Sequence, residues 1–202
     1  MKIFFSNTTD TLVSVVQTGT TGTAIDTRTA GSYALVSTVT VDTNAAKTFA
    51  TGAIGTNQIT LTAHGYKTGI VGQFTTTGAL PTGLSTSTNY YTNVIDANTV
   101  AFYDTQAHAL AGGATGLKTF TATGASGTGT FTPTALSGAS VVGQWSNDQT
   151  NWITDGSAQN ITTAASLGIK NDRPQYAYYR LYYAITAGSL TISNVYVVNK
   201  DS

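Results

Sequence analysis

The chain has 202 residues, with nine basic and nine acidic side chains, no cysteine and a formal net charge of zero. Charged residues make up 9% of it, whereas an ordinary soluble domain has about 25%. This balance argues against nucleic-acid binding, which needs a basic surface, and the lack of cysteine excludes a disulfide framework, a thiolate-bound metal and a thiol nucleophile.

The residue types predict an all-β protein. Threonine supplies 41 residues, glutamate is absent and there is one methionine. β-Branched and aromatic side chains fit a pleated sheet, and turn residues separate them at the intervals of about 8–12 residues that are typical of short strands. In chain order, the predicted strands span residues 11–17, 33–41, 58–62, 70–75, 89–95, 99–103, 118–123, 129–133, 139–146, 176–185 and 189–198.

Two local features refine this pattern. The alternation of apolar and polar residues in 190–198 slips by one near Asn194, which predicts a β-bulge because a one-residue slip moves side chains to the opposite face. A short helix is predicted at residues 105–110, with Asp104 or Thr105 as its N-cap and Gly112 at its end.

The residue composition and strand pattern of the chain change twice along its length. Residues 1–52 and 127–202 share long strands and well-spaced aromatics, whereas residues 53–126 are rich in glycine and threonine and hold both histidines. We interpret the first two segments as a β-sandwich that carries residues 53–126 as an inserted small β-barrel domain, because loops tolerate long insertions. One continuous sandwich or barrel is the alternative.

The inserted segment carries four short motifs in order. They are His64-Gly65, Leu80-Pro81-Thr82-Gly83-Leu84, Tyr90-Tyr91 and Asp96-Ala97-Asn98-Thr99. With these motifs, the segment resembles a small β-barrel module of tailed-phage structural proteins. That module is similar to the first catalytic-cysteine half-domain of ubiquitin-activating enzymes, whose cysteine chemistry this chain lacks. The turn residues of the motifs have structural reasons of their own, since Pro81 and Gly83 favour a tight loop.

The flanking segments also carry phage-like patterns. Residues 141–152 end in a Ser-Asn-Asp turn followed by Trp152, with Gln149 where glycine is usual, and residues 178–183 precede Ala187-Gly188-Ser189 and Lys200. These patterns resemble the hairpins of virion sandwich domains. The resemblance implies a role on the particle as capsid decoration or cement, as a head fibre or as a tail component.

The candidate interface is a tyrosine-rich strand face. In the strand predicted at 176–185, alternation puts Tyr176, Tyr178, Arg180 and Tyr182 on one face and the core residues on the other. Tyrosine and arginine are enriched in buried protein interfaces. A sugar-stacking platform with Trp145 or Trp152, and a plain solvated face, are the alternatives.

No pattern in the sequence predicts catalysis, a cofactor or a metal. A zinc site would need His64 or His108 to meet Asp96 or Asp104 through folding, and no nucleophile elbow is present. Calcium could take oxygens from Asn147-Asp148, or from Asp155 with Asn171-Asp172, but Asn and Asp at such places usually make turns. We therefore expect that the protein is not an enzyme.

The small number of charged residues is the basis for the function that we expect. Free domains keep about 25–35% of their surface charged, so this composition suits a protein packed against partners. We expect a virion structural protein that decorates or cements the capsid as a homo-oligomer, in contact with the major capsid protein or neighbouring virion proteins. A tail or fibre component that recognises host surface glycans is the alternative.

The expected location follows from what the sequence lacks. No signal-peptide pattern or membrane span is visible. We therefore expect synthesis in the host cytoplasm and assembly into the virion, with no nucleic-acid or membrane partner.

Overall fold

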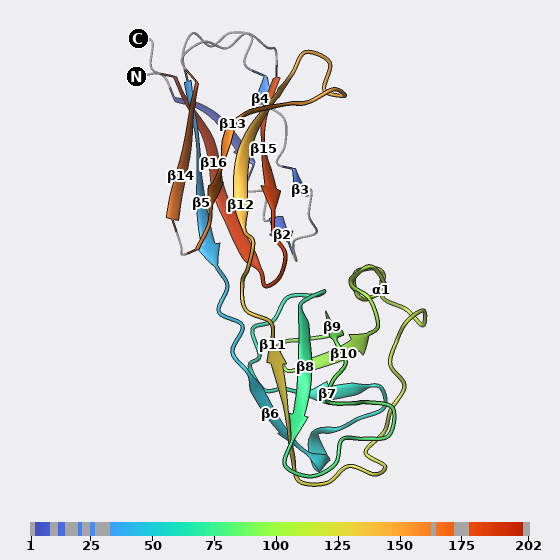
Figure 1. Cartoon of the computed structure of the whole chain (residues 1–202). Helices are drawn as coiled ribbons and strands as arrows, with labels where there is room; N and C mark the ends of the chain where they lie inside the picture. The colour runs from blue at the N-terminus through green and yellow to red at the C-terminus, as the bar shows by residue number, and fades with distance from the viewer. Residues whose placement is uncertain are drawn as a thin grey trace. The chain divides into compact units, whose positions relative to one another are not determined.

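The chain is described by a computed structural model for residues 3–8, 12–14, 20–21, 25–26, 33–162, 165–171 and 178–199. Strands dominate this part of the chain, which confirms the predicted all-β fold. Two compact units are present (Figure 1). The first comprises residues 1–42, 136–186 and 190–202, and the second comprises residues 43–135 with 187–189.

The first unit contains two antiparallel sheets, as a sandwich requires. Its strands are β1 (Ile3–Thr8), β2 (Leu12–Ser14), β3 (Thr20–Thr21), β4 (Ile25–Asp26), β5 (Tyr33–Val41), β12 (Ser140–Ser146), β13 (Ile153–Asn160), β14 (Ala165–Asn171), β15 (Tyr178–Ala184) and β16 (Leu190–Asn199). One sheet has the order β1-β16-β5-β14, with β2 also paired to β16. The other has the order β13-β12-β15-β3, with β4 also paired to β15.

The bulge predicted near Asn194 is confirmed. Between β16 and β5, Ser193 lies opposite Thr38 and Tyr196 lies opposite Val36. Three steps on β16 therefore match two on β5, so β16 carries one extra residue at this point. The bulge lets the strand switch its alternating side chains between faces without ending the pairing.

The described core of the first unit includes residues of β12 and β15, together with Ile161, Ile185 and Leu190. Val141 lies opposite Tyr183 in the register of these strands, and Tyr183 is 0% exposed. By contrast, the described side chains of the edge strand β13 are exposed, with Ile153 at 54%. A bulge interrupts this edge around Gly156, whose φ is +67°, and bulges are one way in which proteins protect open sheet edges.

The second unit is built on a single six-stranded antiparallel sheet. Its elements are β6 (Lys47–Ala50), η1 (Thr51–Ala53), β7 (Gln58–Thr60), β8 (Val71–Thr76), β9 (Tyr90–Val94), β10 (Thr99–Tyr103), α1 (Gln106–Ala111) and β11 (Thr128–Pro133). The sheet order is β6-β11-β8-β9-β10-β7. The end strands β6 and β7 do not pair with each other, and a single bridge joins Ile54 to Ile59. The expected closed barrel is therefore not shown.

The boundaries of the second unit differ from the expected 53 and 126. The residues of β6 and β11 lie in the segments expected to form the sandwich, and no strand was predicted at β6. Because β11 pairs with β8 as well as with β6, both strands belong to the six-stranded sheet. Their aromatic residues explain this placement. Phe49 of β6 and Phe131 of β11 are both buried in the core of the second unit.

The strand predicted at residues 118–123 does not form. Its backbone groups make isolated hydrogen bonds to three different segments instead of a continuous ladder with one strand. Lys118 N–H donates to Phe102 O (2.8 Å), Thr82 N–H donates to Thr123 O (3.1 Å), and Asn57 N–H donates to Phe120 O (2.9 Å). The segment is therefore an irregular stretch held across the surface of the sheet domain.

The short helix agrees with its sequence signals. Thr105, rather than Asp104, is the N-cap, and its Oγ1 accepts a hydrogen bond from His108 N–H (3.2 Å). Gly112 ends the helix at φ +68°, a conformation that glycine adopts at little cost.

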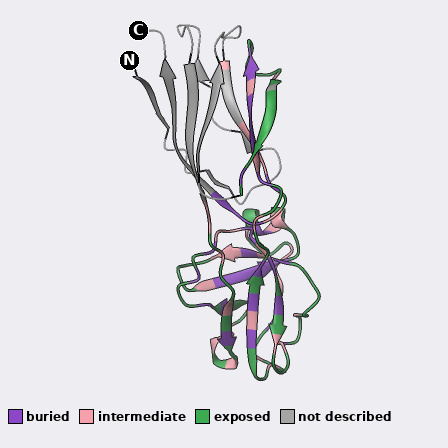
Figure 2. Ribbon diagram, turned by 60° about the vertical axis from the view of Figure 1, so that its left-hand side comes forward, coloured by how far each residue is buried: buried purple, intermediate pink, exposed green. Residues whose placement is uncertain are grey.

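An aromatic cluster forms the core of the second unit. Five neighbouring strands contribute one ring each: Phe49, Phe131, Phe74, Tyr90 and Phe102. The ring of Phe74 lies 4.9–5.8 Å from the other four ring centroids. Figure 2 shows the resulting alternation of buried and exposed residues along these strands. Gly129 is required beside this cluster, because a Cβ there would overlap the ring of Phe49.

We expect Phe74→Ala to lower the free energy of unfolding by about 3–5 kcal/mol, because it leaves a cavity among the four other rings. Urea denaturation of the full chain, followed by tyrosine fluorescence and circular dichroism, measures this loss. Thr75→Val on the exposed face of the same strand is the control and should stay within about 0.5 kcal/mol of the wild type. A loss below about 1 kcal/mol for Phe74→Ala would contradict the central role of this ring.

Candidate functional site

The predicted tyrosine face lies on β15, an internal strand of its sheet. Tyr182 lies opposite Val142 of β12 and Thr21 of β3. Tyr178 and Tyr182 are both half-buried, whereas Tyr183 on the opposite face is fully buried. Tyr183 and Ile185, the described residues of the predicted core face, are therefore buried as expected, and Tyr178 and Tyr182 are partly exposed on the other face.

For the other two members of the predicted interface, the structure describes only the backbone of Arg180 and none of Tyr176. Arg180 occupies the register position between the two tyrosines, opposite Gln144, and Tyr176 lies outside the described residues. The partners of this face stay a prediction. Its chemistry is that of tyrosine edges on a sheet, which suits contact with another protein surface better than catalysis.

The two tryptophans differ in how far they are exposed for stacking against a sugar. Trp145 is 7% exposed and lies opposite Tyr179 on the core side of β12, so it is not a stacking platform. Trp152 is half-buried, and its indole Nε1–H donates to the carbonyl of Gln149 (3.1 Å). Only Trp152 therefore keeps the stacking alternative open.

His64 serves as a structural cross-link between two turns. Its Nδ1 accepts from Tyr66 N–H (2.8 Å), and its Nε2 is 3.0 Å from the carbonyl oxygen of Asp96. Since a backbone N–H can only donate, Nδ1 is the acceptor and Nε2 carries the proton. The ring is buried and both nitrogens are engaged, so His64 is not available as a metal ligand.

His108 pairs with Asp104 at the start of α1. Their Nδ1 and Oδ1 atoms are 2.6 Å apart, and this hydrogen bond is the main cause that lowers the pKa of Asp104. Within the described residues, no group of three or more His, Asp, Glu or Cys side chains could hold a metal. These residues therefore do not assemble the zinc site that was weighed as an alternative.

Asp148 organises the turn between β12 and β13. Its Oδ1 accepts from the backbone N–H groups of Thr150 and Asn151 and from the Ser146 hydroxyl, each at 2.8 Å, and its Oδ2 accepts from Asn151 Nδ2 at 2.7 Å. These bonds, led by that of Asn151 N–H, hold the pKa of Asp148 well below its usual range. All of these hydrogen bonds lie within the turn, so the carboxylate of Asp148 stabilises the turn, as the sequence predicts.

The other residues of the calcium alternative give no support to a site. The side chain of Asp155 and the whole of Asp172 lie outside the described part of the structure. Asn171 ends β14, and Asn147 lies exposed at the turn. The described residues therefore do not bring these oxygens together.

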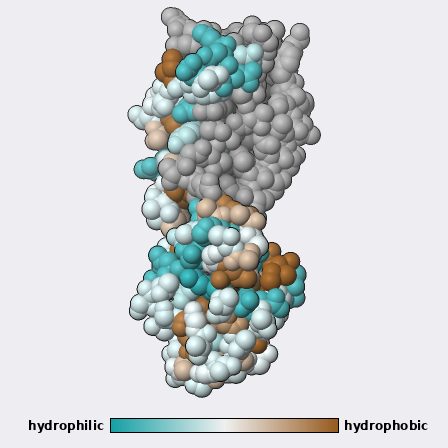
Figure 3. Space-filling view, turned by 90° about the vertical axis from the view of Figure 1, so that its right-hand side faces the viewer, coloured by the Kyte–Doolittle hydropathy of each residue, from teal (hydrophilic) through white to brown (hydrophobic). Residues whose placement is uncertain are grey.

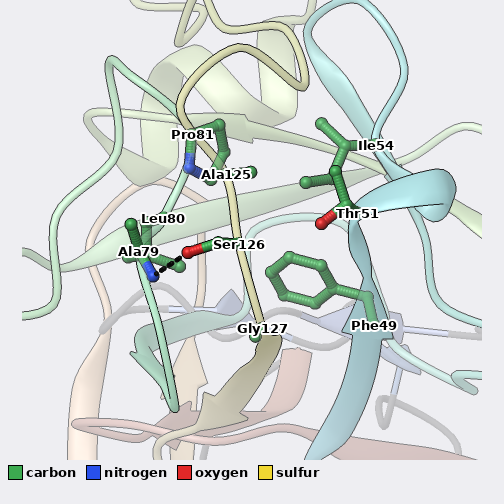
Figure 4. A pocket seen from close by; sticks show the side chains of 10 residues that line it. Phe49, Thr51, Ile54, Ala79, Leu80, Pro81, Ala125, Ser126 and Gly127 are labelled. Carbon is green, nitrogen blue, oxygen red and sulfur yellow. Dashed lines mark hydrogen bonds between the residues drawn. The ribbon is translucent and has the colours of Figure 1, made fainter.

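An enclosed cavity beside Phe49 is too small for a ligand. Figure 4 shows side chains from three segments around it, including Ile54, Pro81 and Ser126. The hydroxyl of Ser126 accepts from Ala79 N–H (3.1 Å) at its edge. Its volume is about 10 Å³, which is about the minimum for one water molecule.

A larger hollow in the second unit was not anticipated from the sequence. It has a volume of about 440 Å³ and is lined by Asn57, Thr82, Thr119, Phe120, Thr121 and Thr123. We call it the threonine hollow. Its residues come from three separate segments, and two of these carry no motif for a binding site, so spacing alone could not have grouped them.

Known proteins give no guide to these sites. Comparison of the chain with protein-family models, with curated proteins and with solved structures finds no match in any of the three. No helix among the described residues has the length and apolar character needed to cross a bilayer.

We expect Asp148→Asn to destabilise the fold at neutral pH and to do so less in acid. The folded-state pKa of Asp148 is lowered, so its ionised form stabilises the fold above the unfolded-state value of about 3.9. This contribution is lost as the pH falls through the folded-state pKa. Chemical denaturation of both proteins at neutral pH and near pH 2.5 tests this, and an equal difference at both would contradict it.

We expect Gln149→Gly to raise the free energy of unfolding by up to about 1 kcal/mol. Gln149 has φ +60°, a left-handed conformation that costs a residue with a Cβ about 1–2 kcal/mol, partly offset by the greater freedom of glycine in the unfolded chain. Gln149→Ala keeps the Cβ and is the matched control. Equal stability of the two variants in urea titrations would show that the turn is unstrained.

Proposed function

We propose that this chain is a non-enzymatic structural protein of a tailed-phage particle, which decorates or cements the capsid through protein–protein contacts. The observation that supports this most is the scarcity of charge on a folded all-β chain. Residues 43–135 contain only five charged side chains: Lys47, Lys67, Asp96, Asp104 and Lys118. In Figure 3, residues of intermediate hydropathy predominate over the described surface of this unit.

The physical argument concerns association. Like charges keep dissolved proteins apart, and low net charge promotes contact between molecules. Threonine hydroxyls hydrate a surface without giving it a repulsive field. A protein with this surface suits a crowded lattice in which it contacts copies of itself and a shell. The phage-like patterns in the sequence point the same way, and the half-buried Tyr178 and Tyr182 supply a face for such contacts.

A second candidate function is a tail or fibre component that recognises host surface glycans. The half-buried Trp152 beside a rigid polar turn supports it, because an aromatic ring with neighbouring polar groups suits a sugar. The two candidates differ in where the protein sits on the particle.

The test is the location of the chain in purified particles of the phage that encodes it. Mass spectrometry should find the chain in the particle, and a cryo-electron microscopy reconstruction should place copies on the capsid surface in a fixed ratio to the capsid subunit. Density on the tail would favour the second candidate. Absence from the particle would overturn both.

A charge substitution tests the tyrosine face. We expect Tyr182→Glu to weaken binding to particles that lack the protein by at least about tenfold, which corresponds to about 1.4 kcal/mol. Thr75→Glu introduces the same charge at an exposed position of β8 and is the control. Equal binding of the two variants, both with wild-type circular dichroism spectra, would remove the face from the interface.

A further inference from the structure

The threonine hollow is assembled by specific contacts between three segments. Asn57 N–H donates to Phe120 O, and Phe120 N–H donates to the side-chain Oδ1 of Asn57, each at 2.9 Å. Thr82 N–H donates to Thr123 O at 3.1 Å. These bonds fix the turn before β7, the loop that holds Thr82 and the segment from Thr119 to Thr123 against one another, so the hollow is preformed.

Asn57 is held in an unusual conformation at the rim of the hollow. Its φ is +59°, which asparagine tolerates better than most residues. In this conformation its Oδ1 is engaged by Phe120 N–H, while its Nδ2 makes no hydrogen bond with the described chain. The residue therefore lines the hollow with an amide that has two donors left to offer.

Threonine hydroxyls supply the other polar groups. The Oγ1 atoms of Thr82 and Thr119 make no hydrogen bond within the described structure, whereas Thr121 Oγ1 donates to Thr123 Oγ1 (3.0 Å), which leaves the Thr123 hydroxyl proton to donate. A Cβ on Gly124 would lie 3.1 Å from Thr82 Oγ1. The glycine thus leaves the space beside that hydroxyl open.

The remaining lining is apolar and uncharged. Phe120 is 4% exposed, so the surface of the hollow, which is more apolar than polar, comes mostly from the threonine side chains. No residue that lines the hollow carries a formal charge. A phosphate, carboxylate or ammonium ligand would lose hydration here without meeting an opposite charge. The hollow has a volume of about 440 Å³ and is largely open to solvent, so it would enclose a ligand only in part.

We propose that the threonine hollow is a binding subsite for one neutral sugar residue. A pyranose has hydroxyl groups around its edge and apolar C–H groups on its faces, which match the donors and the apolar surface described above. The hollow is open and would hold a single sugar residue, so the affinity for a free monosaccharide is in the millimolar range. This inference does not rest on the proposed location in a particle, because it concerns the isolated chain.

The test is a titration of the ¹⁵N-labelled full chain, followed by two-dimensional NMR. D-glucose, D-galactose and N-acetyl-D-glucosamine are each added to about 100 mM, a concentration that detects millimolar binding. We expect at least one sugar to give saturable shifts at the amides of Asn57, Thr82 and Phe120. Sodium phosphate should give none. The proposal would be overturned if none of the three sugars shifted these amides, or if the shifts were linear with concentration and spread over the whole surface.

Near-isosteric variants separate recognition from folding. Asn57→Asp keeps the oxygen that accepts from Phe120 N–H but loses the amide donors, and Thr119→Val keeps the shape but loses the hydroxyl. Each substitution should lower the affinity for the sugar that binds the wild type by at least about fivefold, because one hydrogen bond is lost. Thr132→Val, at an exposed position of β11, should bind as the wild type does. Unchanged binding by a folded Thr119→Val together with a folded Asn57→Asp would overturn the assignment.

Discussion

The second unit depends on the packing of aromatic rings from neighbouring strands against Phe74. Each strand from β6 to β10 in the sheet order places one ring on the same face, and side chains along a strand alternate between faces. On β11 the opposite positions hold threonines. On β9 and β10 they hold Tyr91, Ala101 and Tyr103, which form a second apolar cluster with Ala109 of α1 and Leu117. The same packing sets the place of Gly129, which gives room to the ring of Phe49. On β11, a threonine-covered and charge-poor surface is thus the outer side of the aromatic core.

The regular elements could be predicted because each has a local signal. β5 and β10 lie within the predicted ranges, and Thr105 and Gly112 bound the helix as their side chains dictate. The strands that were missed are β1, β3, β4, β6, β13 and β14. In β13 the described side chains are exposed on both faces, so no alternation marks it. The segment at 118–123 was mistaken for a strand, since its threonines fit a strand while its hydrogen bonds go to isolated partners.

The candidate sites were predictable only where one strand carries them. Tyr178 and Tyr182 share a face because a strand alternates, and sequence periodicity shows this directly. The threonine hollow depends on the pairing of Asn57 with Phe120, which are far apart in the chain and have no shared motif. Such a pairing arises from the tertiary fold, and composition or spacing does not reveal it.

The neighbouring positions of β6 and β11 have a consequence for modularity. Lys47 and Phe131 are paired across antiparallel strands, so β6 and β11, the first and last strands of residues 43–135, lie side by side about 5 Å apart. A hairpin turn of a host protein spans a similar gap. The segment from β6 to β11 can therefore replace such a turn without stretching the recipient backbone, while residues 187–189 complete the unit from elsewhere in the chain.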